Sequence, residues 1–448
     1  MLELLKNEAD LTRTENGALA YRSTNSACLD LFASCGALRH SEDKVIIRKF
    51  VRAYTEAPDI AMRILFYARD VRGGLGERRL FNIIVNYLAD FRPESIIRNL
   101  PLFAEYGRYD DLLSLLNTKC EKRLASFIKA QLRADLDAMK DRKSVSLLAK
   151  WLPSVNTSSL WVQEQAKRLC RLLKMRESEY RKTLSALRAY IGIVENGLRR
   201  RDYTFDYSKL PGKALFKYRR ALRRSDTERY EAYIEAVRAS KAKMNVGTLY
   251  PYEIVRAAMT EQDPSVIRSL DTAWNLLPDH TDSRNALAVI DGSGSMYDDY
   301  GGGILPITVA LSLGLYFAER SRGHFAGHFI TFSEKPQLVE NNLPQSELPE
   351  LLYIISDMEF DDGVDPDKTV FEDAREKFGE YGYRLPQLVY RNVSARREQF
   401  PVRMDEKGVA LVSGASPVLF SQIMSHDLTP FSLMERVLGS DRYKNICA

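Results

Sequence analysis

The sequence predicts an α-helical repeat domain over residues 1–280, followed by a Rossmann-like α/β domain over residues 284–448. Amphipathic segments with apolar residues at helical spacing follow one another as far as about residue 280. Beyond residue 281, short apolar strands alternate with helices, which is typical of a parallel, doubly wound sheet. A chain of 448 residues is also too long for a single core, so more than one domain is expected.

The first half consists of helices with short polar or Gly/Pro connections. Residues 57–73 and 77–91 carry apolar side chains at helical spacing. Further helices are expected over residues 94–116 (broken near Pro101 and Gly107), 122–140, 159–175, 177–198 and 213–239. Their similar lengths, without a strict repeat, favour stacked helical hairpins of the HEAT-like solenoid type.

The second half alternates between the two kinds of element. Strands are expected within residues 285–296, 323–333, 350–362, 386–394 and 408–414. Helices are expected over residues 304–321, 368–383, 417–427 and 428–440. In such sheets ligands bind where the strands end, at their carboxyl edge.

Charge is distributed unevenly along the chain, although the net charge is only +5. Residues 1–280 contain 49 Lys and Arg against 35 Asp and Glu, whereas residues 281–448 contain 16 against 25. Residues 119–224 alone hold 27 basic and 10 acidic residues. A basic half joined to an acidic half indicates nucleic-acid binding by the first. The alternative is that Lys and Arg only solvate helix faces.

Single-stranded RNA requires a basic channel for its backbone and aromatic faces for its bases. The basic region interleaves its cations with five aromatic residues, Trp151, Trp161, Tyr180, Tyr190 and Tyr218. We expect RNA contacts from Arg72, Lys150, Arg168, Arg171, Lys174, Lys217, Arg219 and Arg220.

A glycine-rich stretch, RDVRGGLGERRLF, spans residues 69–81. It lacks the GK[ST] ending of a phosphate-binding loop, and no strand precedes it. One interpretation is a turn between two antiparallel helices. The other is a phosphate site in which Arg69, Arg72, Arg78 and Arg79 surround a helix N-terminus.

Oxygen-bearing side chains follow two of the predicted strands. Asp291, Ser293 and Ser295 follow the first strand, and Asp357 follows the strand within residues 350–362. Spacing of two on a tight turn lets both hydroxyls face one point while the aspartate holds a water, and the intervening glycines permit the turn. Such ligands suit Mg²⁺ or Mn²⁺. The alternative is a serine-rich helix cap.

No catalytic or zinc-binding pattern is present, so we expect no enzymatic activity. The two serines have no histidine at a plausible partner spacing, and DGSGS is not the GxSxG elbow of hydrolases. His324 and His328 are interpreted as surface or packing residues, and no Cys/His zinc pattern exists.

Targeting features indicate a cytoplasmic protein that does not enter membranes. The N-terminal residues MLELLKNEAD do not form a signal peptide, and the longest apolar run, about Leu305–Ala318, is too short to span a bilayer. The five cysteines form no CxxC pair, which favours buried free thiols in a reducing compartment.

Several motifs resemble known families. DGSGS after a strand resembles the metal-ion-dependent adhesion site (MIDAS) of von Willebrand factor A domains, over about residues 284–415. The helical half resembles the TROVE module of the Ro autoantigen family, in AMRILFYARDVRGGLGERRLF and in the order of helical half and A domain. The chain resembles an uncharacterised Ro-related family more closely still, in the stretches ENGALAY, ARDVRGG, YGRYDDLL, AKWLPSVNTSS, LYPYEIV and ISDMEFD.

The resemblance implies a ring of helical repeats closed by the A domain. It implies a ribonucleoprotein scaffold in which the RNA 3′ end enters a basic central hole and structured RNAs lie outside. Misfolded non-coding RNA held there would pass to a nuclease, and we expect the scaffold to be a monomer. The alternative is a protein-interaction adaptor, in which the A-domain metal accepts a partner's carboxylate.

The sequence departs from the A-domain pattern at one point. The resemblance implies a metal-coordinating threonine between the second strand and the strand of ISD. Residues 334–353, EKPQLVENNLPQSELPELLY, contain no threonine. The third oxygen ligand is therefore unassigned.

Overall fold

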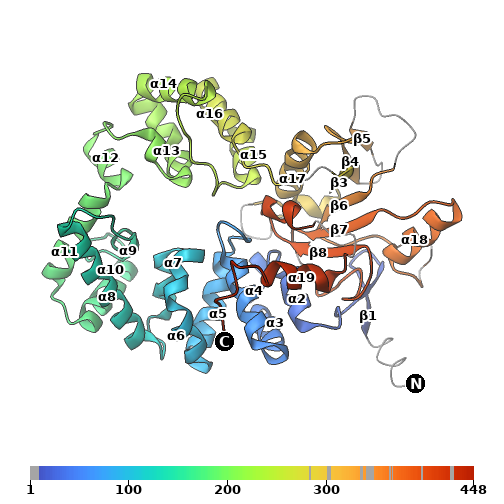
Figure 1. Ribbon diagram of the computed structural model, residues 1–448, viewed down its shortest axis with the longest axis horizontal. Helices are drawn as coiled ribbons and strands as arrows, with labels where there is room; N and C mark the ends of the chain where they lie inside the picture. The colour runs from blue at the N-terminus through green and yellow to red at the C-terminus, as the bar shows by residue number, and fades with distance from the viewer. Residues whose placement is uncertain are drawn as a thin grey trace.

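The computed structural model describes residues 10–281, 284–299, 304–332, 337–339, 348–362, 365, 367–394, 397–423 and 428–448. Figure 1 shows that the helices follow one another in an arc, and that a sheet with its own helices lies between the two ends of the arc. Helix α2 packs against strand β8 at one end, and α15 packs against α17 at the other. The arc and the sheet therefore close into a ring.

The arc consists of amphipathic helices, as the periodicity predicts. They are α2 (Ala27–Ser34), α3 (Asp43–Glu56), α4 (Pro58–Arg69), α5 (Arg78–Phe91), α6 (Pro93–Asn99), α7 (Phe103–Tyr106), α8 (Glu121–Lys140), α9 (Leu148–Trp151), α10 (Leu160–Leu173), α11 (Glu177–Ile191), α12 (Val194–Arg200), α13 (Gly212–Ser225), α14 (Thr227–Arg238), α15 (Pro251–Thr260) and α16 (Pro264–Asn275). Short 3₁₀ turns lie at Leu38–His40, Leu100–Leu102, Tyr109–Leu115 and Tyr207–Lys209.

Two of the predicted helices are each divided in two. The helix expected over residues 177–198 breaks at Gly192, which has φ +65° and ends α11 in a left-handed cap. The helix expected over residues 213–239 breaks at Asp226, where the backbone leaves the helical region. The expected break within residues 94–116 occurs at Pro101 and Gly107.

A small hairpin near the start of the chain was not predicted. Strands β1 (Leu11–Arg13) and β2 (Leu19–Tyr21) pair antiparallel. The hairpin also bridges to the second half of the chain, where Tyr21 pairs with Phe400. Residues 11–21 therefore pack with the α/β domain, although they come first in the sequence.

The α/β region contains the predicted doubly wound sheet. Its strands are β3 (Ala286–Asp291), β4 (Phe329–Phe332), β5 (Gln337–Val339), β6 (Leu351–Ser356), β7 (Gln387–Asn392) and β8 (Val409–Ser413), in the order β5-β4-β3-β6-β7-β8. All pairs are parallel except β4 with the edge strand β5. The strand order reverses direction between β3 and β6, and open sheets bind ligands at such a switch point.

Helices cover both faces of this sheet (Figure 1). They are α17 (Pro306–Arg320), α18 (Val370–Glu380) and α19 (Pro430–Leu438), with 3₁₀ turns at Gly294–Tyr297 and Pro417–Gln422. Side chains alternate between two cores: Val389 joins the core that contains α17, whereas Leu388 and Tyr390 pack with Phe371 of α18. Each parallel strand is thus buried on both sides, which explains its continuous apolar sequence.

The segment of residues 440–448 returns from the sheet to the helical arc. Arg442 and Tyr443 bind the carboxylate of Asp70, which is fully buried in the turn after α4. Further along, the amide of Asn99 donates to the Cys447 carbonyl at 2.6 Å. This segment joins the two halves of the ring beside the contact of α2 with β8.

The described helices include none that is long and apolar enough to cross a membrane. The five cysteines are free, and all except the partly buried Cys447 are buried, as the sequence predicts. Burial raises the pKa of Cys28 and of Cys35 to about 12. Both thiols are therefore protonated at neutral pH.

Candidate functional site

The DGSGS turn lies at the switch point of the sheet. Asp291 ends β3 and Ser356 ends the neighbouring strand β6. The Ser356 hydroxyl donates to Oδ2 of Asp291 at 2.6 Å, and the Ser293 amide donates to Oδ1 at 2.9 Å. The Asp291 side chain, which is 4% exposed, therefore fixes the turn and joins the two strand ends.

The other predicted ligands lie at the same edge. The hydroxyl oxygens of Ser293 and Ser295 are 3.3 Å apart. Asp357 directly follows Ser356 and is buried, and its Oδ1 accepts the Glu359 amide at 3.2 Å. Because the carboxyl ends of parallel neighbours meet, Asp357 lies at the same edge as the two serines although it comes 62 positions after Ser295 in the sequence.

The distance between the two serine hydroxyl oxygens fits a small divalent cation. Adjacent ligands of an octahedral Mg²⁺, each about 2.1 Å from the ion, lie about 3 Å apart, close to the spacing of the two serine oxygens. Both Asp291 oxygens already accept hydrogen bonds, which suits the predicted role of holding a water.

The expected threonine ligand would lie in the loop before β6. Residues 333–336 and 340–347 of this loop lie outside the described part of the chain. Within that part, no three or more His, Cys, Asp and Glu side chains form a metal-binding group. The four predicted ligands at the carboxyl edge of β3 and β6 differ from such a group, because two of them are serine hydroxyls and only two are carboxylates.

The hairpin missed by the sequence analysis covers the acidic turn after β6. The Glu15 amide donates to Oε2 of Glu359 at 2.7 Å, and the Asn16 side chain donates to the Glu359 carbonyl at 2.8 Å. The Thr14 hydroxyl donates to the Phe360 carbonyl at 2.5 Å. Residues of the stretch ENGALAY thus hold the turn after β6 in place through these hydrogen bonds.

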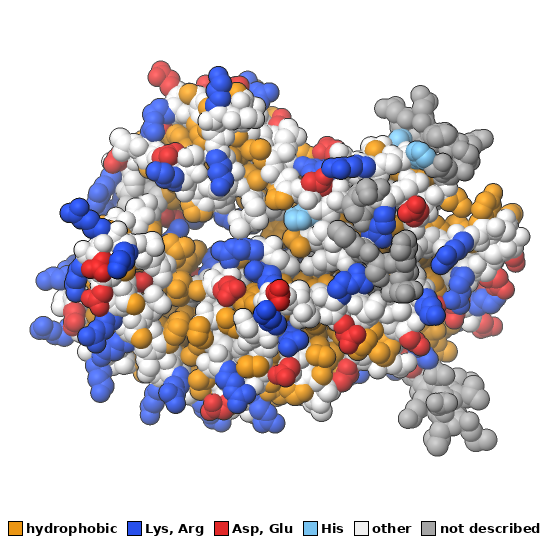
Figure 2. All heavy atoms as spheres, viewed as in Figure 1, with side chains coloured by type: hydrophobic (Ala, Val, Ile, Leu, Met, Phe, Trp, Pro, Cys, Tyr) orange, Lys and Arg blue, Asp and Glu red, His pale blue; other side chains and the backbone are white. Residues whose placement is uncertain are grey.

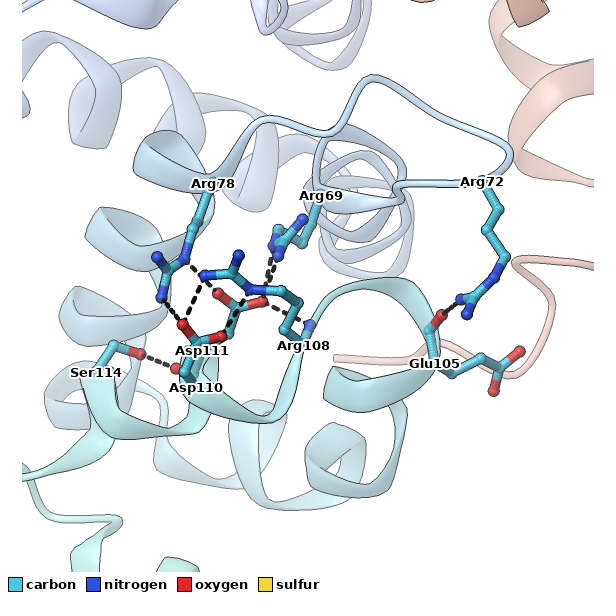
Figure 3. A network of polar contacts seen from close by, with 8 residues as sticks. All are labelled: Arg69, Arg72, Arg78, Glu105, Arg108, Asp110, Asp111 and Ser114. Atoms are coloured by element: carbon cyan, nitrogen blue, oxygen red, sulfur yellow. Dashed lines mark hydrogen bonds and ion pairs between the residues drawn. The ribbon is translucent and has the colours of Figure 1, made fainter. Parts of the chain in front are cut away.

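The glycine-rich stretch of residues 69–81 forms a turn between α4 and α5, and two of its arginines, Arg69 and Arg78, face carboxylates (Figure 3). Arg69 is buried and pairs with Asp111, with Nη2 and Oδ2 2.7 Å apart. Arg78 bonds to both Asp110 and Asp111. The first of the two interpretations is therefore correct for most of this stretch, and the phosphate interpretation is not supported for Arg69 and Arg78.

Arg72 is the predicted RNA contact in this stretch. It is exposed and donates to the Glu105 carbonyl at 2.7 Å (Figure 3). It also lines a cavity of about 170 Å³ together with Tyr250, His280 and Ser416, which come from distant parts of the chain. Figure 2 shows that the molecule is hollowed near the centre of the ring.

The other predicted RNA contacts do not form one cluster, because α13 lies further along the arc than α9 and α10, which both pack against α8 and α11 (Figure 1). Arg168 pairs with Glu121 at 2.6 Å, and Arg220 pairs with Glu261 at 2.7 Å.

Two more of them lie against aromatic rings. The guanidinium of Arg219 lies 4.3 Å from the Phe216 ring centre, and burial lowers its pKa. The ammonium of Lys150 lies 5.4 Å from the Trp151 ring centre. The Arg219 side chain therefore packs against Phe216 and is only partly available for a phosphate contact.

Three predicted cations, Arg171, Lys174 and Lys217, are exposed. Arg171 and Lys174 lie on α10 and its C-terminal cap, and the exposed Lys167 precedes them at helical spacing. Sequence reasoning missed Lys167, although its spacing of four and seven residues was visible.

The aromatic residues predicted to stack on bases differ in exposure. Trp161, in the first turn of α10, is 66% exposed, and Tyr190 is 41% exposed. Tyr180 is fully buried and donates to the Pro153 carbonyl at 3.0 Å, so its prediction is wrong. An exposed ring is required for stacking.

Comparisons with known proteins cover both halves of the chain. The family described as a domain of unknown function, DUF7788, matches residues 285–342 and 338–431. An uncharacterised protein of Acanthamoeba polyphaga mimivirus is 27% identical over 516 aligned residues, which cover 96% of this chain and 87% of that protein.

Among solved structures, the chain resembles the Ro (RSR) protein of Deinococcus radiodurans, with 12% identity and a TM-score of 0.34. The match covers 92% of this chain and 93% of that one. A second domain of unknown function, DUF2828, matches residues 14–134 and 158–284, more than half of the chain. The chain therefore belongs to the DUF2828 family.

Proposed function

We propose that the protein is an RNA-binding scaffold that holds non-coding RNA on the basic face of α10. This basic face consists of Lys167, Arg171 and Lys174, which are exposed and follow one another at helical spacing. Trp161 is exposed six residues before Lys167, in the first turn of the same helix. Cations at this spacing suit consecutive phosphates, and an exposed indole offers a stacking surface for a base.

The neighbouring helix α8 supports this proposal. Lys122, Lys129 and Arg133 are exposed at helical spacing on α8, which packs against α10. One of the few acidic residues nearby, Asp135, is buried and accepts hydrogen bonds from Gln131 and Ser146, so its charge is turned away from the surface. Figure 2 shows Lys and Arg side chains along this side of the ring.

Reversing the charge of the basic face should weaken RNA binding. We expect the variant K167E/R171E/K174E to bind single-stranded RNA far more weakly than the parent protein, since three phosphate contacts are lost. The log–log slope of affinity against salt should fall in magnitude by about two units, at roughly 0.7 per contact. Filter binding or fluorescence anisotropy at several salt concentrations measures both quantities.

A matched control has the same change in net charge elsewhere. Arg384, Lys407 and Arg436 are exposed cations of the α/β region, and R384E/K407E/R436E should retain the affinity and the salt slope. Equal losses in both triple variants would mean that only net charge matters, and the proposal would then be wrong.

A protein-interaction adaptor is the second candidate, favoured by the paired serine hydroxyls beside the buried Asp291. In this proposal Ser293 and Ser295 hold Mg²⁺ or Mn²⁺, and Asp291 and Asp357 orient its waters. The ion would supply the charge that attracts a partner's carboxylate.

Removing the two hydroxyls tests this second candidate. We expect S293A/S295A to bind Mn²⁺ at least about tenfold more weakly by calorimetry, because each lost ligand removes an oxygen from the shell. The thermal unfolding of the variant should stay close to that of the parent. The exposed Ser158, two residues before the start of α10, provides the control, S158A, with unchanged Mn²⁺ binding. Parent protein that binds no Mn²⁺ would exclude the metal site.

A further inference from the structure

A second cavity lies at the carboxyl edge of the sheet, beyond the DGSGS turn. Its volume is about 240 Å³, and it is enclosed by α2, α3, the ends of β7 and β8, and residues 397–401. Asn392 at the end of β7 and Leu411 of β8 line it from the sheet side. The cavity is therefore formed by two parts of the chain that are about 350 residues apart.

Positive charge predominates in this cavity. Arg48, Lys49 and Arg397 line it, and Glu398 is the one acidic residue in the lining. Arg48 donates to Oε1 of Glu398 at 2.8 Å, and the Lys49 ammonium lies 3.7 Å from the same oxygen. The lining thus contains one carboxylate and three cations, and two of these cations share that carboxylate.

Lys49 is an unusual lining residue because only 7% of it is exposed. Burial lowers the pKa of its ammonium, and the nearby Glu398 carboxylate opposes that shift. Asp30, the other carboxylate that acts on Lys49, already accepts from the Thr24 amide and hydroxyl at 2.8 Å. Lys49 shares the Glu398 carboxylate with Arg48, so the positive charge of the two side chains is only partly neutralised. A bound anion would supply the remaining counter-charge.

A buried amide provides an independent observation. Gln399 lines the cavity and is 7% exposed. Its Nε2 donates to the Met358 carbonyl at 3.0 Å, whereas Oε1 has no hydrogen-bond donor among the described residues. A buried acceptor without a donor is costly, so a ligand with an N–H or O–H group would stabilise it.

Most of the rest of the lining is apolar and includes Leu38, Val45, Met358 and Phe400. A ligand that fits the whole cavity therefore combines an anionic group, a hydrogen-bond donor and an apolar ring. We propose that this cavity binds a free nucleoside monophosphate. The phosphate would contact Arg48, Lys49 and Arg397, and a donor of the base or sugar would contact Gln399. This proposal is independent of RNA binding by α10.

Calorimetry with the full chain and adenosine 5′-monophosphate tests the proposal, with inorganic phosphate and adenosine as comparison ligands. We expect the monophosphate to bind more tightly than either, because only it fills both the cationic and the apolar parts. No binding of the monophosphate at millimolar concentration would overturn the proposal. Equal binding of adenosine or of inorganic phosphate would also overturn it.

Two variants connect binding to these residues. R397Q changes an exposed side chain and should weaken monophosphate binding about tenfold, the effect of one charge-assisted hydrogen bond. K49M replaces a buried cation by a side chain of similar length, leaves Arg48 to pair with Glu398, and should weaken binding at least as much. R384Q, at an exposed arginine outside the lining, should bind like the parent.

Unchanged affinity in R397Q would overturn the assignment whether or not K49M folds. Thermal unfolding with and without the monophosphate gives a second readout. The parent and R384Q should gain stability from the ligand, and R397Q should gain less. An equal gain in all three proteins would place the ligand at another site.

Discussion

Replacing Asp111 by alanine is expected to lower the free energy of unfolding by about 3–5 kcal/mol. Asp111 is fully buried, and its Oδ2 accepts from Nε of Arg69 at 2.8 Å while Oδ1 accepts from Nε of Arg78 at 2.8 Å (Figure 3). The Arg69 side chain is only 3% exposed. The substitution would leave that guanidinium buried without a counter-charge, which is much more costly than losing an exposed pair. Urea unfolding followed by circular dichroism measures the change.

An exposed ion pair provides the control. Asp137 pairs with Lys140 at 2.9 Å with both side chains largely exposed, and D137A should cost less than about 1 kcal/mol. Removing both charges should also be less harmful than removing one, so R69M/D111L should be more stable than D111A. If D111A were no more destabilising than D137A, the network of Figure 3 would not be a source of stability.

Replacing Asp70 by alanine is expected to cost about 3 kcal/mol and to release the segment of residues 440–448 from the helical arc. Asp70 is fully buried and accepts from Nη2 of Arg442 at 2.6 Å and from the Tyr443 hydroxyl at 2.9 Å. Burial, with the Asp70 carboxylate as the next cause, raises the pKa of Tyr443. The phenol therefore stays protonated and donates its hydrogen bond at any physiological pH.

Hydrogen exchange distinguishes release of this segment from a general loss of stability. In D70A the amides of residues 440–448 should exchange faster, whereas those of β3 should keep most of their protection. The exposed Arg436 of α19 is the control, since R436A removes a cation close in sequence, whereas the cation bound to Asp70 is Arg442. Uniform acceleration throughout the D70A protein would show that the contact does not act locally.

The contact of Asp70 with Arg442 and Tyr443 could not be predicted from a local sequence pattern. The glycines in the turn after α4 show the reason, because the side chains packed against them come from distant parts of the chain. A Cβ on Gly73 would lie 2.8 Å from Nε of Arg442, and one on Gly76 would lie 2.2 Å from the Tyr250 hydroxyl. From the sequence, these glycines fit either a turn or a phosphate site. Their close neighbours are side chains from residues 250 and 442, which no local pattern connects to this turn.

The sheet-edge residues were predictable for a general reason. Strand periodicity identified β3 and β6, and parallel neighbours bring their carboxyl ends together, so Asp291 and Asp357 had to lie at one edge. Two contacts at that edge were not predictable. Ser356 donates to Asp291, and the hairpin covers Glu359, because both depend on how separate elements pack.

The sequence by itself determined the helical arc, the doubly wound sheet and the uneven charge, because periodicity and composition are local properties of the chain. Tertiary structure alone decided which cations have a carboxylate partner. Arg69 and Arg78 pair with carboxylates 42 and 33 residues away, whereas Arg171 and Lys174 stay at the surface of α10. The physical reason is that the fate of a charge depends on which carboxylates the fold brings within a few ångströms, and that proximity is a long-range property.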